Sequence, residues 1–214
     1  MIKIYKAGIL GGSFDPVHLG HIGLALDARK NADLHEVVFV PARIQPFKQD
    51  RKVTSGEDRL AMLRLALSQY DELTVSSTEL DHEGVSYTYL TLRRLQEFYD
   101  DVASRKGYDM AKLYFITGTD SLLKLDTWMN ATELLHKYSY IVGSRPGYLQ
   151  EELEEMMEYL LNEYGTEIIN LPQMQMDVSS TEIRRRISDG QPLTGLVPQS
   201  VERYIAEHGL YHTA

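Results

Sequence analysis

The chain has 214 residues, 43% of them hydrophobic and 25% charged, which is typical of a globular protein that can bury a substantial core. Its formal net charge of −9 argues against a nucleic-acid partner, because such binding needs a basic face. The absence of cysteine excludes disulfides, thiol catalysis and cysteine-ligated zinc. No apolar run reaches the roughly 20 residues of a membrane span, and the N-terminus lacks the pattern of a signal peptide. We therefore expect a cytoplasmic protein with no membrane partner.

Short apolar runs alternate with longer segments of helical spacing along almost the whole chain. The predicted strands are residues 2–10, 36–40, 73–75, 112–117, 138–142 and 167–171. The predicted helices run from the first glycine turn to about residue 30, from Ser55, from Ser86, over 149–164, over 179–187 and over 201–208. Residues 100–109 are predicted to be a loop, and the segment around Trp128 a helix or a loop. This alternation predicts a single α/β domain over residues 1–214 with a doubly wound parallel sheet.

The turn after the first predicted strand carries the most informative pattern. Gly11 and Gly12 have no Cβ atom, so the backbone there can approach a ligand closely. His18 and His21 lie three residues apart at the entrance of the next helix, on one helical face. A helix N-terminus attracts phosphate, so the combination predicts a polyphosphate site rather than a turn with two solvated histidines. Asp15, before a proline, is expected to shape the turn.

A second anion-binding pattern lies near the C-terminus. Ser179, Ser180 and Thr181 place hydroxyls and unpaired backbone amides at the predicted start of a helix. Arg184 follows one turn later, and helical side chains lean toward the N-terminus, so it can reach the same anion. Alone, this segment is equally consistent with a helix cap followed by a solvated run of arginines. Paired with the histidine turn, it favours phosphate binding, and we expect the C-terminal helices, about 179–210, to complete the site.

Three further positions are candidates on weaker grounds. Lys48 lies in a loop that contains two prolines, and a lysine is a point charge suited to phosphate. Asp120, after Gly118 at the end of a predicted strand, either accepts hydrogen bonds from a ribose or caps a helix. Trp128 is the only tryptophan, and it either joins the core or offers a flat stacking surface.

Two absent motifs narrow the class. The sequence has no G-x-x-x-x-G-K-[ST] motif, which disfavours a P-loop NTPase. Its first turn does not read G-x-G-x-x-G, which disfavours a dinucleotide-dependent dehydrogenase.

The motifs resemble those of one known family. His-Leu-Gly-His at 18–21 is similar to the HxGH signature of the nucleotidyltransferase superfamily, which has a Rossmann-like fold and is related to class I aminoacyl-tRNA synthetases. GGSFDPVHLGH at 11–21, with SSTEIR at 179–184, resembles the bacterial nicotinate-nucleotide adenylyltransferases. Further matches, in family order over nearly the whole chain, are residues 86–88, 115–120, 128, 145–147 and 177–181.

The resemblance implies transfer of AMP from ATP to nicotinate mononucleotide, giving deamido-NAD and pyrophosphate in NAD biosynthesis. It implies catalytic roles for His18, His21, Lys48 and Arg184, and ATP binding by Gly11, Gly12, Ser13, Phe14, Gly20, Gly118, Asp120, Ser180 and Thr181. It also implies that Thr88, Trp128 and Met129 bind the acceptor. The chain departs from the family pattern at Phe47, Leu90 and Met129, which usually are histidine, aspartate and tyrosine, and in a longer loop around 100–109.

Direct in-line transfer fits these residues, because the acceptor's phosphate is already a nucleophile and the protein need only align and stabilise charge. We expect Mg²⁺ to be carried by ATP and water, since no carboxylate cage and no protein metal site is predicted. Three alternatives remain: a sibling enzyme using nicotinamide mononucleotide or another phosphorylated acceptor, a non-catalytic nucleotide-binding module, and an RNA binder related to tRNA synthetases. A homo-oligomer is left open.

Overall fold

The protein contains one parallel sheet in the computed structural model, which describes residues 2–45, 53–143, 150–171 and 178–212. The strands of the described chain are β1 (Ile4–Gly12), β2 (Glu36–Pro41), β3 (Leu73–Val75), β4 (Met110–Gly118), β5 (Ser139–Gly143) and β6 (Ile168–Asn170). Their order is β3-β2-β1-β4-β5-β6, and every neighbouring pair is parallel. The order reverses beside β1, which confirms the predicted doubly wound α/β fold.

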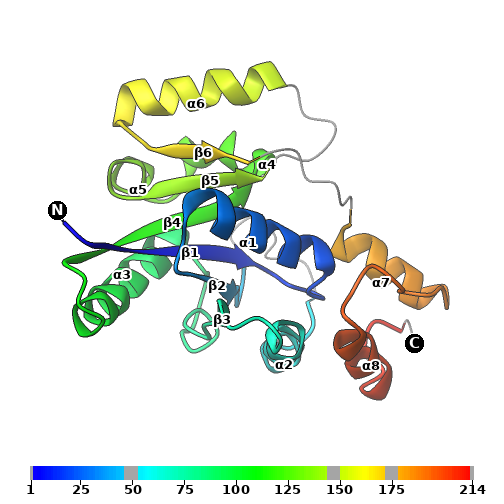
Figure 1. Ribbon diagram of the computed structural model, residues 1–214. Coiled ribbons are helices and arrows are strands. Elements are labelled where there is room, and N and C mark those ends of the chain that lie inside the picture. The colour runs from blue at the N-terminus through cyan, green and yellow to red at the C-terminus, as the bar shows by residue number, and fades with distance from the viewer. Residues whose placement is uncertain (1, 46–52, 144–149, 172–177, 213–214) are drawn as a thin grey trace.

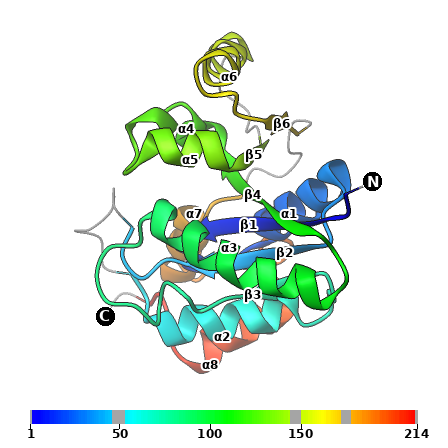
Figure 2. The same ribbon diagram turned by 90° about the vertical axis from the view of Figure 1, so that its left-hand side faces the viewer.

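Helices cover both faces of this sheet (Figures 1 and 2). They are α1 (Leu19–Ala32), α2 (Gly56–Leu67), α3 (Thr88–Arg105), α4 (Thr119–Leu122), η1 (Leu125–Thr127), α5 (Ala131–Lys137), α6 (Gln150–Tyr164), α7 (Ser180–Ser188) and α8 (Gln199–Glu207). One core cluster joins α1, α2, α7 and α8 to the sheet, and the other joins α3, α5 and α6 to the opposite face.

The central strands are apolar on both sides because both faces are covered. In β2, Val37 and Phe39 enter the core cluster beneath α1, whereas Val38 and Val40 enter the cluster beneath α3. All four side chains are buried. The continuous β-branched run in the sequence is therefore a strand buried on both faces, as its composition predicts.

One predicted loop is wrong. Residues 100–105 form the last turns of α3, and only 106–109 connect that helix to β4. Tyr99 and Ala103 are buried and continue the apolar face of the helix, although the charged residues between them give the sequence a polar appearance. The first strand also ends later than predicted, at Gly12 rather than Leu10, so both glycines belong to the end of β1.

The last two helices lie together near the start of α1. Figure 1 shows α7 and α8 on one side of the molecule, next to the C-terminus and far from the N-terminus. The backbone amide of Leu19, the first residue of α1, donates to the carbonyl of Leu196 at 2.9 Å, and α8 packs against α2. The C-terminal part of the chain is thereby brought to the carboxyl end of β1, where ligands bind in folds of this kind.

Candidate active site

Two adjoining cavities open at the carboxyl end of the sheet. The larger has a volume of about 600 Å³ and the smaller about 290 Å³. Both are lined by Gly11, Gly12, Gln45, Thr117 and Asp120, so they share a wall formed by the ends of β1 and β4. We call the smaller one the polar cavity and the larger one the ring-lined cavity, after the side chains described below.

The polar cavity collects every predicted ATP-site residue that the structure describes. Its lining includes His18, His21, Arg184, Gly11, Gly12, Ser13, Phe14, Gly20, Gly118, Asp120, Ser180 and Thr181. The ring-lined cavity collects the three predicted acceptor residues, which are Thr88, Trp128 and Met129. Lys48 and its neighbour Phe47 lie outside the described residues, as do the matches at 145–147 and Asp177.

The two histidines cap the helix on which they lie. His18 is the N-cap residue of α1 and accepts from the backbone amide of His21, while His21 accepts from the backbone amide of His18, each through Nδ1 at 3.3 Å. Their rings are stacked with centroids 3.6 Å apart. Because Nδ1 accepts in both rings, the hydrogen of each imidazole in its neutral form belongs on Nε2.

The side chain of Phe14 packs against the histidine pair. Its backbone is left-handed at φ 49°, an uncommon conformation for a bulky residue, and its buried ring contacts His21 edge-on with centroids 4.9 Å apart. A Cβ atom on Gly12 would lie 3.1 Å from the Phe14 ring. Gly12 therefore leaves room for the aromatic ring that supports the histidines.

The run of three arginines divides between two environments. Arg184 Nη1 donates to the carbonyl of Asp15, and its Nη2 donates to Thr181 Oγ1 at 3.2 Å, which holds the guanidinium in the wall of the polar cavity. Arg185 and Arg186 instead form ion pairs with Glu182 on the outer surface. These arginines lower the pKa of Glu182 to about 2. The solvated-run interpretation is thus correct for Arg185 and Arg186 and wrong for Arg184.

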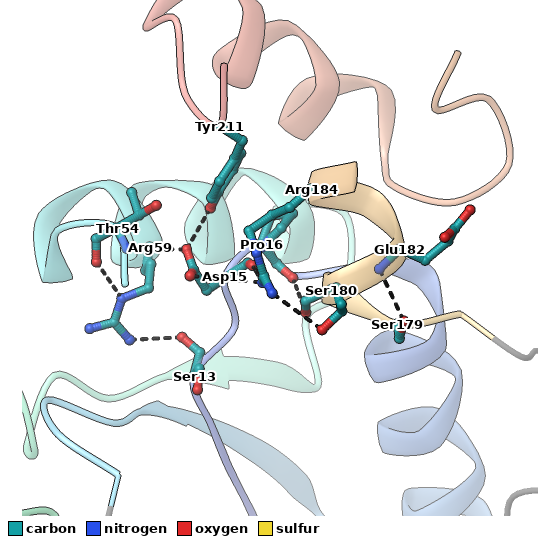
Figure 3. Close-up of polar contacts among 11 residues, drawn as sticks. Ser13, Asp15, Pro16, Thr54, Arg59, Ser179, Ser180, Glu182, Arg184 and Tyr211 are labelled. Atoms are coloured by element: carbon teal, nitrogen blue, oxygen red, sulfur yellow. Dashed lines mark hydrogen bonds and ion pairs between the residues drawn. The ribbon is translucent and has the colours of Figure 1, made fainter. Parts of the chain in front are cut away.

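The hydroxyl groups at the start of α7 have structural partners. Ser179 is the N-cap residue and accepts from the backbone amide of Glu182, and Ser180 Oγ donates to the carbonyl of Pro16 at 2.9 Å (Figure 3). Ser180 therefore ties α7 to the histidine turn through its hydroxyl. The donors that remain for an anion at the N-terminus of α7 are chiefly the backbone amides and Arg184.

Gly118 and Asp120 lie where β4 passes into α4. Gly118 is the N-cap residue of α4, so the alternative interpretation of Asp120 as a helix cap is wrong. The Asp120 side chain is exposed and lines both cavities. A Cβ atom on Gly118 would lie 2.9 Å from Asp120 Oδ1, so the glycine leaves space for that carboxylate.

Aromatic rings and the start of α3 shape the ring-lined cavity. Trp128 is half-buried and contacts Phe115 edge-on, with centroids 5.9 Å apart. Thr88 is the first residue of α3, and Met129 is 45% exposed. Trp128 packs against the core and also lines the cavity, while its role as a stacking surface stays a prediction.

Sequence patterns gave no signal for Glu79, which also lines the ring-lined cavity. Its buried carboxylate accepts from Thr91 Oγ1 at 2.5 Å, and burial raises the pKa of the group. Arg59, on α2, was missed as well. Its buried guanidinium donates to the carbonyls of Ser13, Ala42 and Thr54, and burial lowers its pKa. Both act through contacts between distant segments, which no local motif records.

Among the described residues, no group of three or more His, Asp or Glu side chains could hold a metal ion. No described helix is long and apolar enough to cross a membrane.

Comparisons with known proteins identify the family of the chain. The cytidylyltransferase-like family model matches residues 9–186, a span that includes both histidines, both cavities and Arg184. The fold and the site therefore define the chain as a cytidylyltransferase-like protein. Solved structures agree on the fold: a Plasmodium falciparum nicotinic acid mononucleotide adenylyltransferase complexed with NaAD superposes with a TM-score of 0.75 at 20% identity, with 97% of each chain covered.

More similar sequences narrow the class. A probable nicotinate-nucleotide adenylyltransferase of Carboxydothermus hydrogenoformans is 41% identical over 96% of this chain and 98% of its own length. Another, of Thermoanaerobacter sp. (strain X514), is 37% identical over 99% of this chain and 96% of its own. The chain belongs to this family, the nicotinate-nucleotide adenylyltransferases.

Proposed function

We propose that the protein transfers AMP from ATP to nicotinate mononucleotide, giving nicotinate adenine dinucleotide and pyrophosphate as a step of NAD biosynthesis. The observation that carries the proposal is the pair of adjoining cavities with a shared wall at Gly11, Gly12 and Asp120. A bisubstrate transfer needs one compartment for a polyphosphate, a second for the acceptor and a point where the two meet. The paired histidines and Arg184 suit the first compartment, and Trp128 suits the second.

In this mechanism the acceptor phosphate attacks the α-phosphorus of ATP in line with the leaving pyrophosphate. The new bond joins an acceptor oxygen to that phosphorus, and the α–β phosphoanhydride bond breaks with its electron pair leaving on pyrophosphate. Nε2–H of His18 and of His21 would donate to the phosphate oxygens, and Arg184 would hold the distal phosphates together with the backbone amides at the start of α7. Lys48 is proposed to add a further positive charge. No protein nucleophile is required.

The nucleoside part of ATP is assigned to the shared wall. Asp120 lines both cavities and is exposed, so its carboxylate can accept hydrogen bonds from ribose hydroxyls. The glycine ends of β1 and β4 let the nucleotide approach the backbone. On the acceptor side, Trp128 offers its ring to the pyridine, and Thr88 lies at a helix N-terminus that favours a carboxylate.

Mg²⁺ is proposed to enter as part of the MgATP substrate. The described residues form no carboxylate cluster that would hold it as a resident ion. Mg²⁺ keeps several waters and binds readily through substrate phosphates, where it neutralises charge. The cytoplasmic location and the single-domain arrangement remain predictions, and a homo-oligomer is left open.

Pyrophosphate release with MgATP tests the proposal, with nicotinate mononucleotide, nicotinamide mononucleotide and phosphopantetheine compared side by side. Preference for the first is the expected result. Preference for either of the others would support the assignment of the ATP site and identify the protein as a sibling enzyme with a different acceptor. This alternative is tested because Met129, which is exposed, stands where the family usually has tyrosine. No release with any acceptor would overturn the transfer and leave a nucleotide-binding module. A gel shift with tRNA tests the RNA-binding alternative.

A further inference from the structure

Tyr211 lies in the C-terminal segment and contacts Asp15, a residue of the polar cavity's lining. It follows α8, and its backbone is left-handed at φ 67°, a conformation that costs a bulky residue energy and persists only where other contacts hold it. Its hydroxyl donates to Asp15 Oδ1 at 2.8 Å (Figure 3). Burial raises the pKa of the phenol, so it remains a hydrogen-bond donor at neutral pH. This backbone conformation places the Tyr211 hydroxyl against the carboxylate of Asp15, 196 residues earlier in the chain.

The carboxylate that receives this hydrogen bond is deeply buried. The side chain of Asp15 is 3% exposed and lines the polar cavity. Its Oδ1 also accepts from the backbone amide of Thr54 at 3.3 Å, and its Oδ2 lies 3.9 Å from Arg184 Nη1. A buried carboxylate needs such donors, because desolvation is costly unless it is paired and hydrogen-bonded.

Asp15 in turn contacts Arg184, which also donates to Thr181 Oγ1. Arg184 Nη1 donates to the backbone carbonyl of the same residue, so one residue contacts the guanidinium through both its carbonyl and its carboxylate. Figure 3 shows Tyr211, Asp15 and Arg184 brought together from three separate segments. Arg184 carries its positive charge whatever its neighbours are, but these contacts orient the guanidinium toward the cavity.

We propose that Tyr211 is a positioning residue for the polyphosphate half of the site. It fixes the Asp15 carboxylate, and Asp15 fixes the Arg184 guanidinium that meets the distal phosphates of ATP. This inference rests on the proposed function for the identity of the ligand, but it concerns only the ATP half. Loss of the hydroxyl leaves the positive charge in place and disturbs its direction, so ATP binding weakens while acceptor binding is unaffected.

The chain offers a closely matched control. Tyr204, on α8, donates its hydroxyl to Asp58 Oδ1 on α2 at 2.9 Å. Tyr204→Phe therefore removes the same kind of phenol–carboxylate hydrogen bond from the same C-terminal region. Asp58 does not line the polar cavity, so this variant reports the structural cost alone. Thermal melts of both variants establish the temperature at which each is fully folded.

ATP affinity, measured by calorimetric titration with MgATP, is the main readout. We expect the Kd for ATP to rise about tenfold in Tyr211→Phe, because this variant loses a hydrogen bond to a charged group. In Tyr204→Phe the Kd for ATP should stay within twofold of the wild-type value. The KM for nicotinate mononucleotide should change by less than twofold in both. In an Arg184→Ala background, adding Tyr211→Phe should change the ATP Kd by less than twofold, because its effect passes through the arginine.

Three results would overturn the proposal. They are an unchanged ATP Kd in Tyr211→Phe, an equal loss of affinity in the two tyrosine variants, and effects of Tyr211→Phe and Arg184→Ala that simply multiply. Failure of the proposed function is a separate observation: wild-type protein would bind ATP and release no pyrophosphate, and the titration would still decide the role of Tyr211. Wild-type protein that binds no ATP would overturn both.

Discussion

The polar cavity and the ring-lined cavity are neighbours built in different ways. Around the polar cavity, the polar side chains are held in place by other parts of the chain: the histidines by each other's backbone amides, Arg184 by Asp15, and Ser180 by Pro16. The lining of the ring-lined cavity instead includes several aromatic rings, with Trp128 packed edge-on against Phe115.

This difference matches the two tasks of a transferase. Charge that develops on phosphate oxygens is stabilised only by donors already pointing at it, so the polar half needs rigid support. Recognition of an aromatic acceptor is achieved largely by shape and stacking, which a few ring positions can set and a single substitution can alter. The departure from the family pattern at Met129 lies in the ring-lined half. We therefore expect substitutions in the polar half to lower turnover or ATP affinity, and those in the ring-lined half to alter acceptor affinity.

The largest effect is expected at the histidines. His18→Ala or His21→Ala should lower kcat by about 10²–10³, as the loss of a preorganised donor does in other enzymes. Steady-state pyrophosphate release measures this. His136→Ala is the control, because His136 is exposed and bonds the carbonyl of Tyr164 away from both cavities. An unchanged kcat in both histidine variants would contradict a role in the transition state.

The adjacent arginines give the next test. Arg184→Ala should raise the KM for ATP by about 10- to 100-fold through the loss of charge-assisted hydrogen bonds, with little change in the KM for the acceptor. Arg186→Ala should leave both constants within twofold, because Arg186 pairs with Glu182 on the outer surface. Similar losses in the two variants would mean that net positive charge, rather than position, governs ATP binding.

Trp128→Ala should act on the other half of the site. We expect the KM for nicotinate mononucleotide to rise about tenfold through lost stacking, while the ATP Kd is unchanged. Initial-rate measurements at saturating ATP give the first value, and titration with MgATP gives the second. Phe98→Ala is the control, since Phe98 is an aromatic residue of α3 that is 55% exposed. A loss of ATP affinity in Trp128→Ala would show that the two cavities do not act separately.

The smallest effect is expected at Glu79 and concerns stability. Burial raises its pKa above the ordinary value of 4.5, so the folded state holds this proton more tightly than the unfolded state does. Its stability contribution is therefore most favourable below pH 4.5 and is lost as the pH rises through the higher folded pKa. Glu79→Gln removes the titration, and Gln can still accept from Thr91.

Melting curves at several pH values test this. The difference in Tm between Glu79→Gln and wild type should grow as the pH rises through that window and then level off. Glu83→Gln, on an exposed side chain of the same segment, is the control for the loss of one charge. A difference that does not change with pH would mean that Glu79 is ionised equally in the folded and unfolded states.

Much of the architecture could be predicted because its causes are local. The β-branched run before Pro41 predicts a strand, and the glycine turn before His18 predicts a helix start, each from a few neighbouring residues. Alternation of such segments indicates parallel strands. The predicted loop at 100–109 was wrong because the charged residues of α3 masked its buried positions, Tyr99 and Ala103. Packing on the sheet determined the helix there, and the local polarity did not.

The support of the site could not be predicted for the opposite reason. Asp15, Arg59 and Tyr211 are joined by contacts between segments far apart in the chain, and a sequence without a fold gives no sign that they meet. Glu79 is similar, since the donor to its buried carboxylate is Thr91 on α3. The residues proposed to touch ligand belong to recognisable motifs. Of those that hold them, Arg59 and Tyr211 belong to none, and Asp15 lies in the histidine motif, which does not show its distant partners.

The polar cavity is formed where the beginning of the chain meets its last third. Residues 11–21 supply one side and residues 179–184 supply the other, with β2 to β6 between them in sequence. A nucleotide bound there would act as a removable cross-link that joins α1 to α7. At a ligand concentration of 100 times Kd this adds about 2.7 kcal/mol to the stability of the folded state. We expect ATP to slow amide hydrogen exchange most in α7, whose N-terminus lines the cavity.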